Sequence, residues 1–136
     1  MIGRAFAARW AATVRTGSDR LARLNGPSNM AVMALSGSLA ALALPPLNAL
    51  PALFTFTFLM LTLDHRQSLR SAFATGWAFA FGYHIAGLYW ISNALLVDGD
   101  RFAWAVPFAV AGLPAVLGLF GGLAALLYGW LGPRGW

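Results

Sequence analysis

The sequence predicts an all-α protein, a multi-pass transmembrane helical bundle with about four membrane segments and with both termini in the cytoplasm. Three observations support this fold class. Of the 136 residues, 60% are hydrophobic and only 10% are charged, whereas soluble domains carry about a quarter charged residues. Uncharged apolar runs alternate with short polar loops, as in chains that cross a bilayer several times. The basic residues are all arginines, and most lie in the segments that this topology places inside.

Residues 1–29 are expected to form a basic cytoplasmic arm. They hold five arginines and one aspartate and end in the turn-forming letters NGPSN at 25–29. Residues 2–15 also fit an amphipathic helix on an anionic membrane surface, because their apolar side chains fall on about a third of a helical wheel. Surface helix and partly ordered tail both stay open. A cleaved signal peptide over 1–43 is disfavoured, because the arm is too long for an n-region.

The first uncharged run contains two short segments rather than one helix. The stretch LPPLNALP at 44–51 places three prolines and an asparagine in its middle, and proline pairs break helices. The segments 30–44 and 49–63 would each cover about 23 Å at 1.5 Å per residue, less than the ~30 Å hydrocarbon core. They predict either two thin, tightly turned spans or a re-entrant hairpin.

Two longer apolar segments follow the polar loop DHRQSLR. Residues 71–96 are uncharged apart from one histidine and are expected to form a single tilted transmembrane helix. The acidic turn VDGDRF leads to the last segment, 103–131, whose two prolines are tolerated when neighbouring groups satisfy the freed backbone. Residues 132–136 are expected to form a short cytoplasmic tail.

The charged residues fix the orientation and exclude some functions. Four crossings starting from the cytoplasm place eight arginines inside and only Arg101 outside. The net charge of +5 would suggest nucleic acid in a soluble chain, but here the arginines follow the membrane topology, so no nucleic-acid partner is expected. Without cysteine there is no disulfide, thiolate nucleophile or cysteine-based metal site.

Small residues recur at four-residue spacing in the two longer segments. Such ridges let helix backbones approach each other closely. We therefore expect helix packing at Ala74, Ala78, Gly82, Ala86, Gly118 and Gly122. Near the outer end of 71–96, the side chains of Tyr89, Trp90 and Asn93 are expected to lie in a membrane-interface belt.

His84 lies in the middle of an apolar run, and an ionisable group inside a membrane segment is a functional hypothesis by default. A proton relay or metal site would need partners, and Asn93, nine residues on, falls on the opposite helix face. We interpret His84 as a neutral imidazole hydrogen-bonded between helices, with catalysis as the alternative. No catalytic, cofactor-binding or metal-ligating residues are predicted, because no nucleophile has a base at a suitable spacing and no phosphate loop is present.

The order of the elements is more specific than any one of them. A Pro-Pro turn follows a short apolar segment, and a second short segment ends in a basic loop. Next come LRSAFATGWAFAFGYHIAGLYWISNAL, a turn, and a long helix opened by Trp104 and Pro107. This order resembles the N-terminal membrane region of apolipoprotein N-acyltransferases over about residues 30–131. The core of the match is Ser71, Ala72, Gly76, Gly82, Gly87, Trp90 and Ile91.

The resemblance implies a bacterial inner (plasma) membrane family that moves an acyl chain from a phospholipid to the N-terminal cysteine of a lipoprotein. In that family a periplasmic nitrilase-like domain supplies Glu, Lys and Cys for the chemistry. This chain contains none of the three residue types, so no catalytic role carries over. We expect a membrane portion, a truncated or split gene product, that is inactive alone. Its expected partners are the phospholipid bilayer and the remaining half of the acyltransferase. The alternative is a free-standing four-helix scaffold or partner subunit.

Overall fold

The computed structural model describes residues 27–45, 47–64, 68–97, 101 and 103–132. Every regular element within these residues is helical, which confirms the predicted all-α class. Nearly all of the expected basic arm, the middle of the acidic turn and most of the expected C-terminal tail lie outside the described residues.

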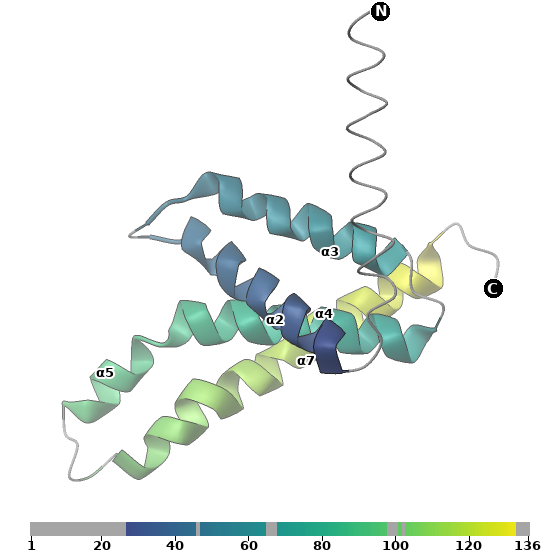
Figure 1. Cartoon of the computed structure of the whole chain (residues 1–136). Helices are drawn as coiled ribbons and strands as arrows, with labels where there is room; N and C mark the ends of the chain where they lie inside the picture. The colour runs from purple at the N-terminus through teal and green to yellow at the C-terminus, as the bar shows by residue number, and fades with distance from the viewer. Residues whose placement is uncertain (1–26, 46, 65–67, 98–100, 102, 133–136) are drawn as a thin grey trace, which may run out of the picture.

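The first two helices form a hairpin. Helix α2 (Pro27–Ala40) continues into the 3-10 turn η1 (Ala41–Ala43), and η2 (Leu50–Leu53) leads into α3 (Phe54–Asp64). α2 begins inside the predicted turn-forming end of the arm, because proline fits the first turn of a helix. Between the helices Asn48 has a φ of 49°, a left-handed conformation that asparagine tolerates. Figure 1 shows α3 running back beside α2 from this turn.

The last helix is the longest. It runs from Ala103 to Leu131 through η3 (Ala103–Ala105), the π-helical turn η4 (Phe108–Gly112) and α7 (Leu113–Leu131). With 29 residues and a mean hydropathy of 2.1, it is the one helix of the described chain long and apolar enough to cross a membrane. Only 22% of its apolar window is buried. Because no other helix of the described residues passes this test of length and hydropathy, the four-span arrangement stays a prediction.

Helix α4 (Leu69–Leu88) ends earlier than expected, so the single helix predicted over 71–96 is corrected to two. The chain turns at Tyr89 and Trp90, and α5 (Ile91–Leu96) follows. The Ser92 hydroxyl donates to the Tyr89 carbonyl at 2.6 Å, and the Ser92 amide also donates to it at 3.1 Å. Serine side chains that bond back to a carbonyl often accompany bends in helices.

Helices α2 and α4 meet backbone against backbone. A Cβ added at Gly82 would overlap the Ala34 carbonyl, and one added at Gly37 would overlap the Phe79 carbonyl. Ser38 Oγ lies 3.0 Å from the carbonyl oxygens of both Ala34 and Gly82, so it donates across this contact. Further along the same contact, Asn29 Nδ2 donates to Thr75 Oγ1 at 3.3 Å. Both side chains are buried, so this hydrogen bond pairs two polar groups in an apolar core. Glycine is required where the backbones touch.

Helices α4 and α7 form the second close contact, on another face of α4. A Cβ added at Gly76 would lie 2.5 Å from the carbonyl oxygen of Gly121. The indole N–H of Trp77 donates to the Ala115 carbonyl at 3.0 Å, and its ring stacks on Phe81 with centroids 5.2 Å apart. α4 is therefore the central helix, with α2 on one side and α7 on another.

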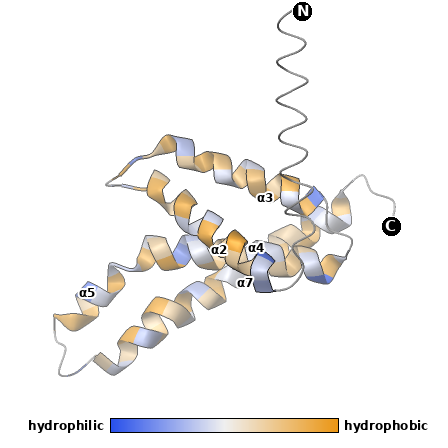
Figure 2. Ribbon diagram, in the orientation of Figure 1, coloured by the Kyte–Doolittle hydropathy of each residue, from blue (hydrophilic) through white to orange (hydrophobic). Residues whose placement is uncertain are grey.

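The last helix runs back beside α4 and α5, so these helices form a second hairpin. The two hairpins place the ends of the helices at two ends of the molecule. In Figure 1 the start of α4 and the ends of α3 and α7 lie together, opposite the turn that joins α2 to α3 and the α5 end of the second hairpin. Asp64 ends α3 and Arg70 lies in the first turn of α4, so both belong to the first of these ends, whereas Arg101 shortly precedes η3 at the other. The long helices between them are coloured mainly as apolar in Figure 2.

Two alanine substitutions on α4 test the backbone contact with α2. Gly82→Ala should lower the free energy of unfolding in detergent by about 1–3 kcal/mol, because the new methyl group forces two backbones apart. Gly87→Ala is the matched control, since its Cβ would meet only the flexible Leu44 side chain, at 3.3 Å. The control should be neutral or stabilising by up to about 1 kcal/mol, because alanine favours helix. Equal effects of the two substitutions would contradict the contact.

The indole hydrogen bond between α4 and α7 gives a second prediction. Trp77→Phe removes the donor and leaves the part-buried Ala115 carbonyl without it, so we expect a loss of about 1–2 kcal/mol in the free energy of unfolding. Trp104→Phe is the control, because the exposed Trp104 N–H bonds only the carbonyl of Arg101, three residues away. Thermal melts of both variants in the same detergent should show a lower Tm for Trp77→Phe.

Candidate functional site: an apolar groove beside His84

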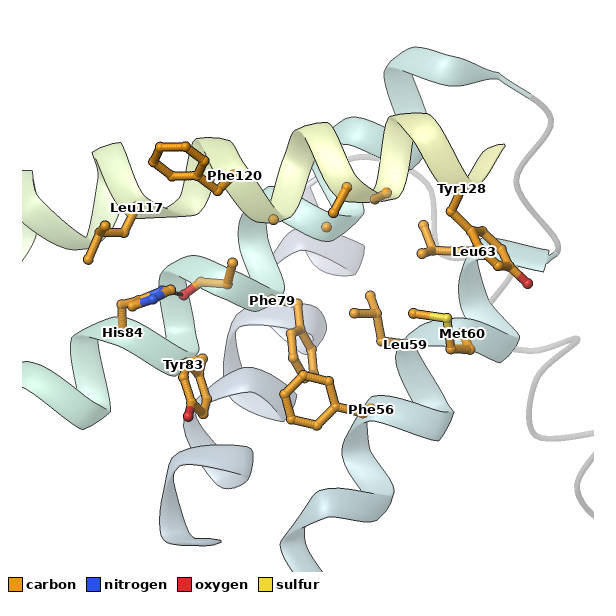
Figure 3. A pocket seen from close by; sticks show the side chains of 15 residues that line it. Phe56, Leu59, Met60, Leu63, Phe79, Tyr83, His84, Leu117, Phe120 and Tyr128 are labelled. Atoms are coloured by element: carbon orange, nitrogen blue, oxygen red, sulfur yellow. Dashed lines mark hydrogen bonds between the residues drawn. The ribbon is translucent and has the colours of Figure 1, made fainter. Parts of the chain in front are cut away.

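An open groove of about 540 Å³ lies between α3, α4 and α7. Its walls are aromatic and aliphatic side chains from all three helices, and its floor consists of small residues where α4 and α7 cross. Figure 3 shows the α3 wall facing Tyr128 of α7, with His84 at the other end. Its lining includes Leu59, Met60, Phe79, Leu117, Phe120 and the floor residues Gly76, Ala80, Gly121 and Ala124.

The α3 wall is held by an aromatic cluster and one hydrogen bond. The ring of Phe56 packs edge-on against Phe79 of α4 with centroids 5.0 Å apart, and against Tyr83 at 6.1 Å. At the other end of α3 the Tyr128 hydroxyl donates to Asp64 Oδ1 at 2.9 Å. These contacts join α3 to α4 and α7 at the two ends of the groove.

His84 lies half-buried at the groove's inner end. Its Nδ1 is 2.7 Å from the carbonyl oxygen of Ala80, and because a carbonyl oxygen only accepts, Nδ1 carries the hydrogen. This bond lies within α4, and the expected hydrogen bond of His84 between helices stays a prediction. The ring also packs edge-on against Tyr83, with centroids 5.4 Å apart.

The groove has the chemistry of a binding surface. Among its lining residues His84, Tyr83 and Tyr128 are the ones with polar side chains, and none is a carboxylate. Within the described residues no three His, Cys, Asp or Glu side chains come together in a way that would hold a metal ion. Apolar side chains make up most of the lining, so the arrangement fits apolar binding better than chemistry.

The six small residues of the predicted ridges differ in burial and in the helix against which they pack. Ala78 and Gly82 are buried, and Gly82 faces α2. Ala74 and Ala86 are half-buried. The remaining two lie on α7 under aromatic rings of α4, since a Cβ at Gly118 would meet the Trp77 ring and one at Gly122 the Phe73 ring. The predicted belt residues are all exposed: Tyr89 and Trp90 at the break between α4 and α5, and Asn93 within α5.

Three glycines at backbone contacts were missed by sequence reasoning. Gly37 packs against α4, and Gly76 packs against Gly121 of α7. The letters carried a signal for two of them, because Gly76 with Ala80 and Gly121 with Ala125 have the same four-residue spacing as the predicted ridges. That spacing identifies a face able to pack closely but does not identify its partner.

Comparison with known proteins matches the same stretch of chain. The family described as "Apolipoprotein N-acyltransferase N-terminal domain" matches residues 36–136. The apolipoprotein N-acyltransferase of Allorhizobium ampelinum is 52% identical over 101 residues, which are 67% of this chain and 19% of that protein. The one from Sinorhizobium medicae is 44% identical over 129 residues, 88% of this chain and 24% of that protein.

A third relative gives a similar result. The apolipoprotein N-acyltransferase of Rhodopseudomonas palustris is 46% identical over 99 residues, 68% of this chain and 18% of that protein. The chain thus spans about a fifth of the length of these relatives. No solved structure matches it. The resemblance inferred from the order of the elements is confirmed, and the chain belongs to the family of apolipoprotein N-acyltransferase N-terminal domains.

Proposed function

We propose that the chain is a membrane anchor that borders the lipid path of an acyltransferase whose chemistry is done elsewhere. The observation that carries this proposal is the family match over residues 36–136, which corresponds to the N-terminal portion of proteins named apolipoprotein N-acyltransferase. Acyl transfer from phospholipid to a lipoprotein is the activity of the whole protein in this proposal. The remaining half of such an acyltransferase is the proposed protein partner.

Exposed apolar side chains support placement in a bilayer. Large contiguous apolar patches are rare on soluble monomers, yet α7 exposes Phe120 by 68%, Trp130 by 64% and Leu131 by 72%. A core helix of a soluble protein would bury such residues, whereas the apolar window of this helix is only 22% buried. α2 and α3 add exposed Leu35 and Phe54. In hydrocarbon these surfaces would be solvated by lipid chains.

We further propose that the four segments cross a bacterial inner membrane with both termini inside. The arginine distribution supports this orientation, and the two hairpins are compatible with it because they bring the start of α4 and the ends of α3 and α7 to one end. α2 with η1 and η2 with α3 are 17 and 15 residues long. At 1.5 Å per residue they reach about 25 and 22 Å, so thin spans and a re-entrant hairpin are both compatible with their lengths.

Single cysteines test the orientation, because the chain has none of its own. Val97→Cys should react with a membrane-impermeant thiol reagent on intact cells, and Ser28→Cys should react only after the cells are opened. Both side chains are exposed in the structure, so accessibility does not bias the comparison. Labelling of Ser28→Cys but not Val97→Cys on intact cells would reverse the topology.

The chain alone should transfer no acyl groups. A thioester intermediate needs a cysteine thiolate and a base, and the chain contains no cysteine, while His84 has no carboxylate beside it in the groove. Purified chain, labelled phospholipid and a diacylated lipopeptide acceptor should give no labelled acceptor. A full-length relative, such as the Sinorhizobium medicae protein, serves as the positive control. Label that appears on the acceptor and is lost with His84→Ala would contradict the proposal.

A further inference from the structure

Helices α4 and α7 each have the length of the hydrocarbon core of a bilayer. At 1.5 Å per residue the 20 residues of α4 cover about 30 Å and the 19 residues of α7 about 28 Å, and the core is ~30 Å thick. The two helices are level at one end, because a Cβ added at Gly129 would lie 3.5 Å from the Leu69 side chain and 3.7 Å from Cβ of Ala72. Both helices therefore reach the opposite edge of the core at about the same level, near Leu88 and Leu113.

The chain is interrupted at this level in both helices. Directly after α4 it turns at Tyr89 and Trp90. Directly before α7 lies the π-helical turn η4, where the Leu113 amide donates to the Phe108 carbonyl, five residues back. Beyond the two interruptions α5 lies beside η3 and η4. These three elements form a separate hairpin, which we call the outer arm.

A straight crossing of the membrane would need an unusual tilt. The chain from Leu69 to Leu96 has 28 residues and the last helix has 29, so each would measure about 42 Å as one straight helix. Fitting 42 Å into the ~30 Å core requires a tilt of about 45°, whereas transmembrane helices tilt by about 0–40°. The interruptions at Trp90 and Gly112 instead let the outer arm turn away from α4 and α7.

The side chains of the outer arm and of the break before it suit the boundary between hydrocarbon and water. Trp90, Trp104 and Phe108 are exposed, and tryptophan is enriched at both membrane interfaces. Polar Asn93 is exposed on α5, and Arg101 is exposed shortly before η3. Polar and charged side chains are costly in hydrocarbon. An interfacial helix, in contrast, buries its apolar side by about 5–10 Å at the headgroup boundary and keeps its polar side in water.

We propose that the outer arm is an interfacial membrane-binding surface. It leaves the hydrocarbon core at Tyr89 and Gly112 and lies along the lipid headgroups on the side of the membrane opposite Leu69. Trp104 and Phe108 anchor it between headgroups and acyl chains. Its partner is the lipid surface, because these rings continue the exposed apolar face of α7 that lipid is proposed to cover. The inference rests on the membrane placement proposed above.

Spin labels test the depth of the outer arm. The whole chain, which has no cysteine, is labelled at Tyr89→Cys, Leu96→Cys or Leu123→Cys, all exposed positions, in vesicles of phosphatidylethanolamine and phosphatidylglycerol. Collision rates with oxygen and with a water-soluble nickel chelate give the depth of each label. We expect the Tyr89 and Leu96 labels at the interface, within about 3 Å of one depth, and the Leu123 label near the middle of the core. In a straight helix tilted by about 45° the Leu96 label would lie about 7 Å nearer to water than the Tyr89 label.

Loss of an anchoring ring gives a second readout. Phe108→Ser should raise the collision rate of the Leu96 label with the nickel chelate by about fivefold, because the arm loses an apolar ring that holds it at the boundary. Trp104→Phe keeps an apolar ring and should change this rate little. Trp130→Ser removes a similarly exposed ring at the other end of α7, so it is the matched control and should leave the rate unchanged. The Tm of each variant in detergent checks that it is folded.

The contrary outcomes are distinguishable. A Tyr89 label inside the core, with the Leu96 label nearer to water, would mean a straight and strongly tilted crossing and would overturn the interfacial arm. A Leu96 label in water that does not respond to Phe108→Ser would overturn lipid as the partner and leave the arm as a surface for another protein. Either result leaves the membrane placement intact. Release of the chain from the vesicles by alkaline carbonate would overturn the membrane placement and the interfacial arm together.

Discussion

The contact between the backbones of α2 and α4 is the constraint on which the rest of the fold depends. At Gly37 and Gly82 no side-chain atom fits between the helices, so main chain packs on main chain. Ser38 adds a hydrogen bond across the same point. α3 follows α2 through a short turn, so the α2–α4 contact also places the start of α3. Phe56 and Asp64 then hold α3 against α4 and α7. Two glycines that do not line the groove therefore help to place its α3 wall.

Local rules were enough to predict the helices and some of their ends. Composition, together with the alternation of apolar runs and polar loops, predicted an all-helical chain, and the prolines of LPPLNALP predicted the turn in which Asn48 adopts its left-handed conformation. The break at Tyr89 and Trp90 was missed, because the run 71–96 has no glycine or proline at that point. The Ser92 hydroxyl bonds a carbonyl three residues back at the break, a choice that serine leaves open in any helix.

The groove could not be predicted because it depends on how three helices are placed side by side. Each wall taken alone is an ordinary apolar helix face, and the floor exists only because Gly76 meets Gly121. Spacing of small residues showed that close packing was available but not which faces meet. His84 was singled out for its ionisable ring, and its bond to Ala80 shows that the ring is held by its own helix. Its place at the end of a groove depends on the packing of three helices, which its own sequence neighbours do not reveal.

The contact between α4 and α7 divides the last helix into two arms of unequal length. At Gly76 and Gly121 the backbones of the two helices are in contact, and both helices continue beyond that point. Ala103 lies eighteen residues from Gly121, about 27 Å along the helix, whereas Leu131 lies ten residues away, about 15 Å. A rotation of about 5° at the crossing would move the Ala103 end by about 2 Å and the Leu131 end by about 1 Å, if each arm stays rigid. The two arms are unequal, so a small tilt beside the groove becomes a larger displacement at the far aromatic end, where Trp104 and Phe108 are exposed.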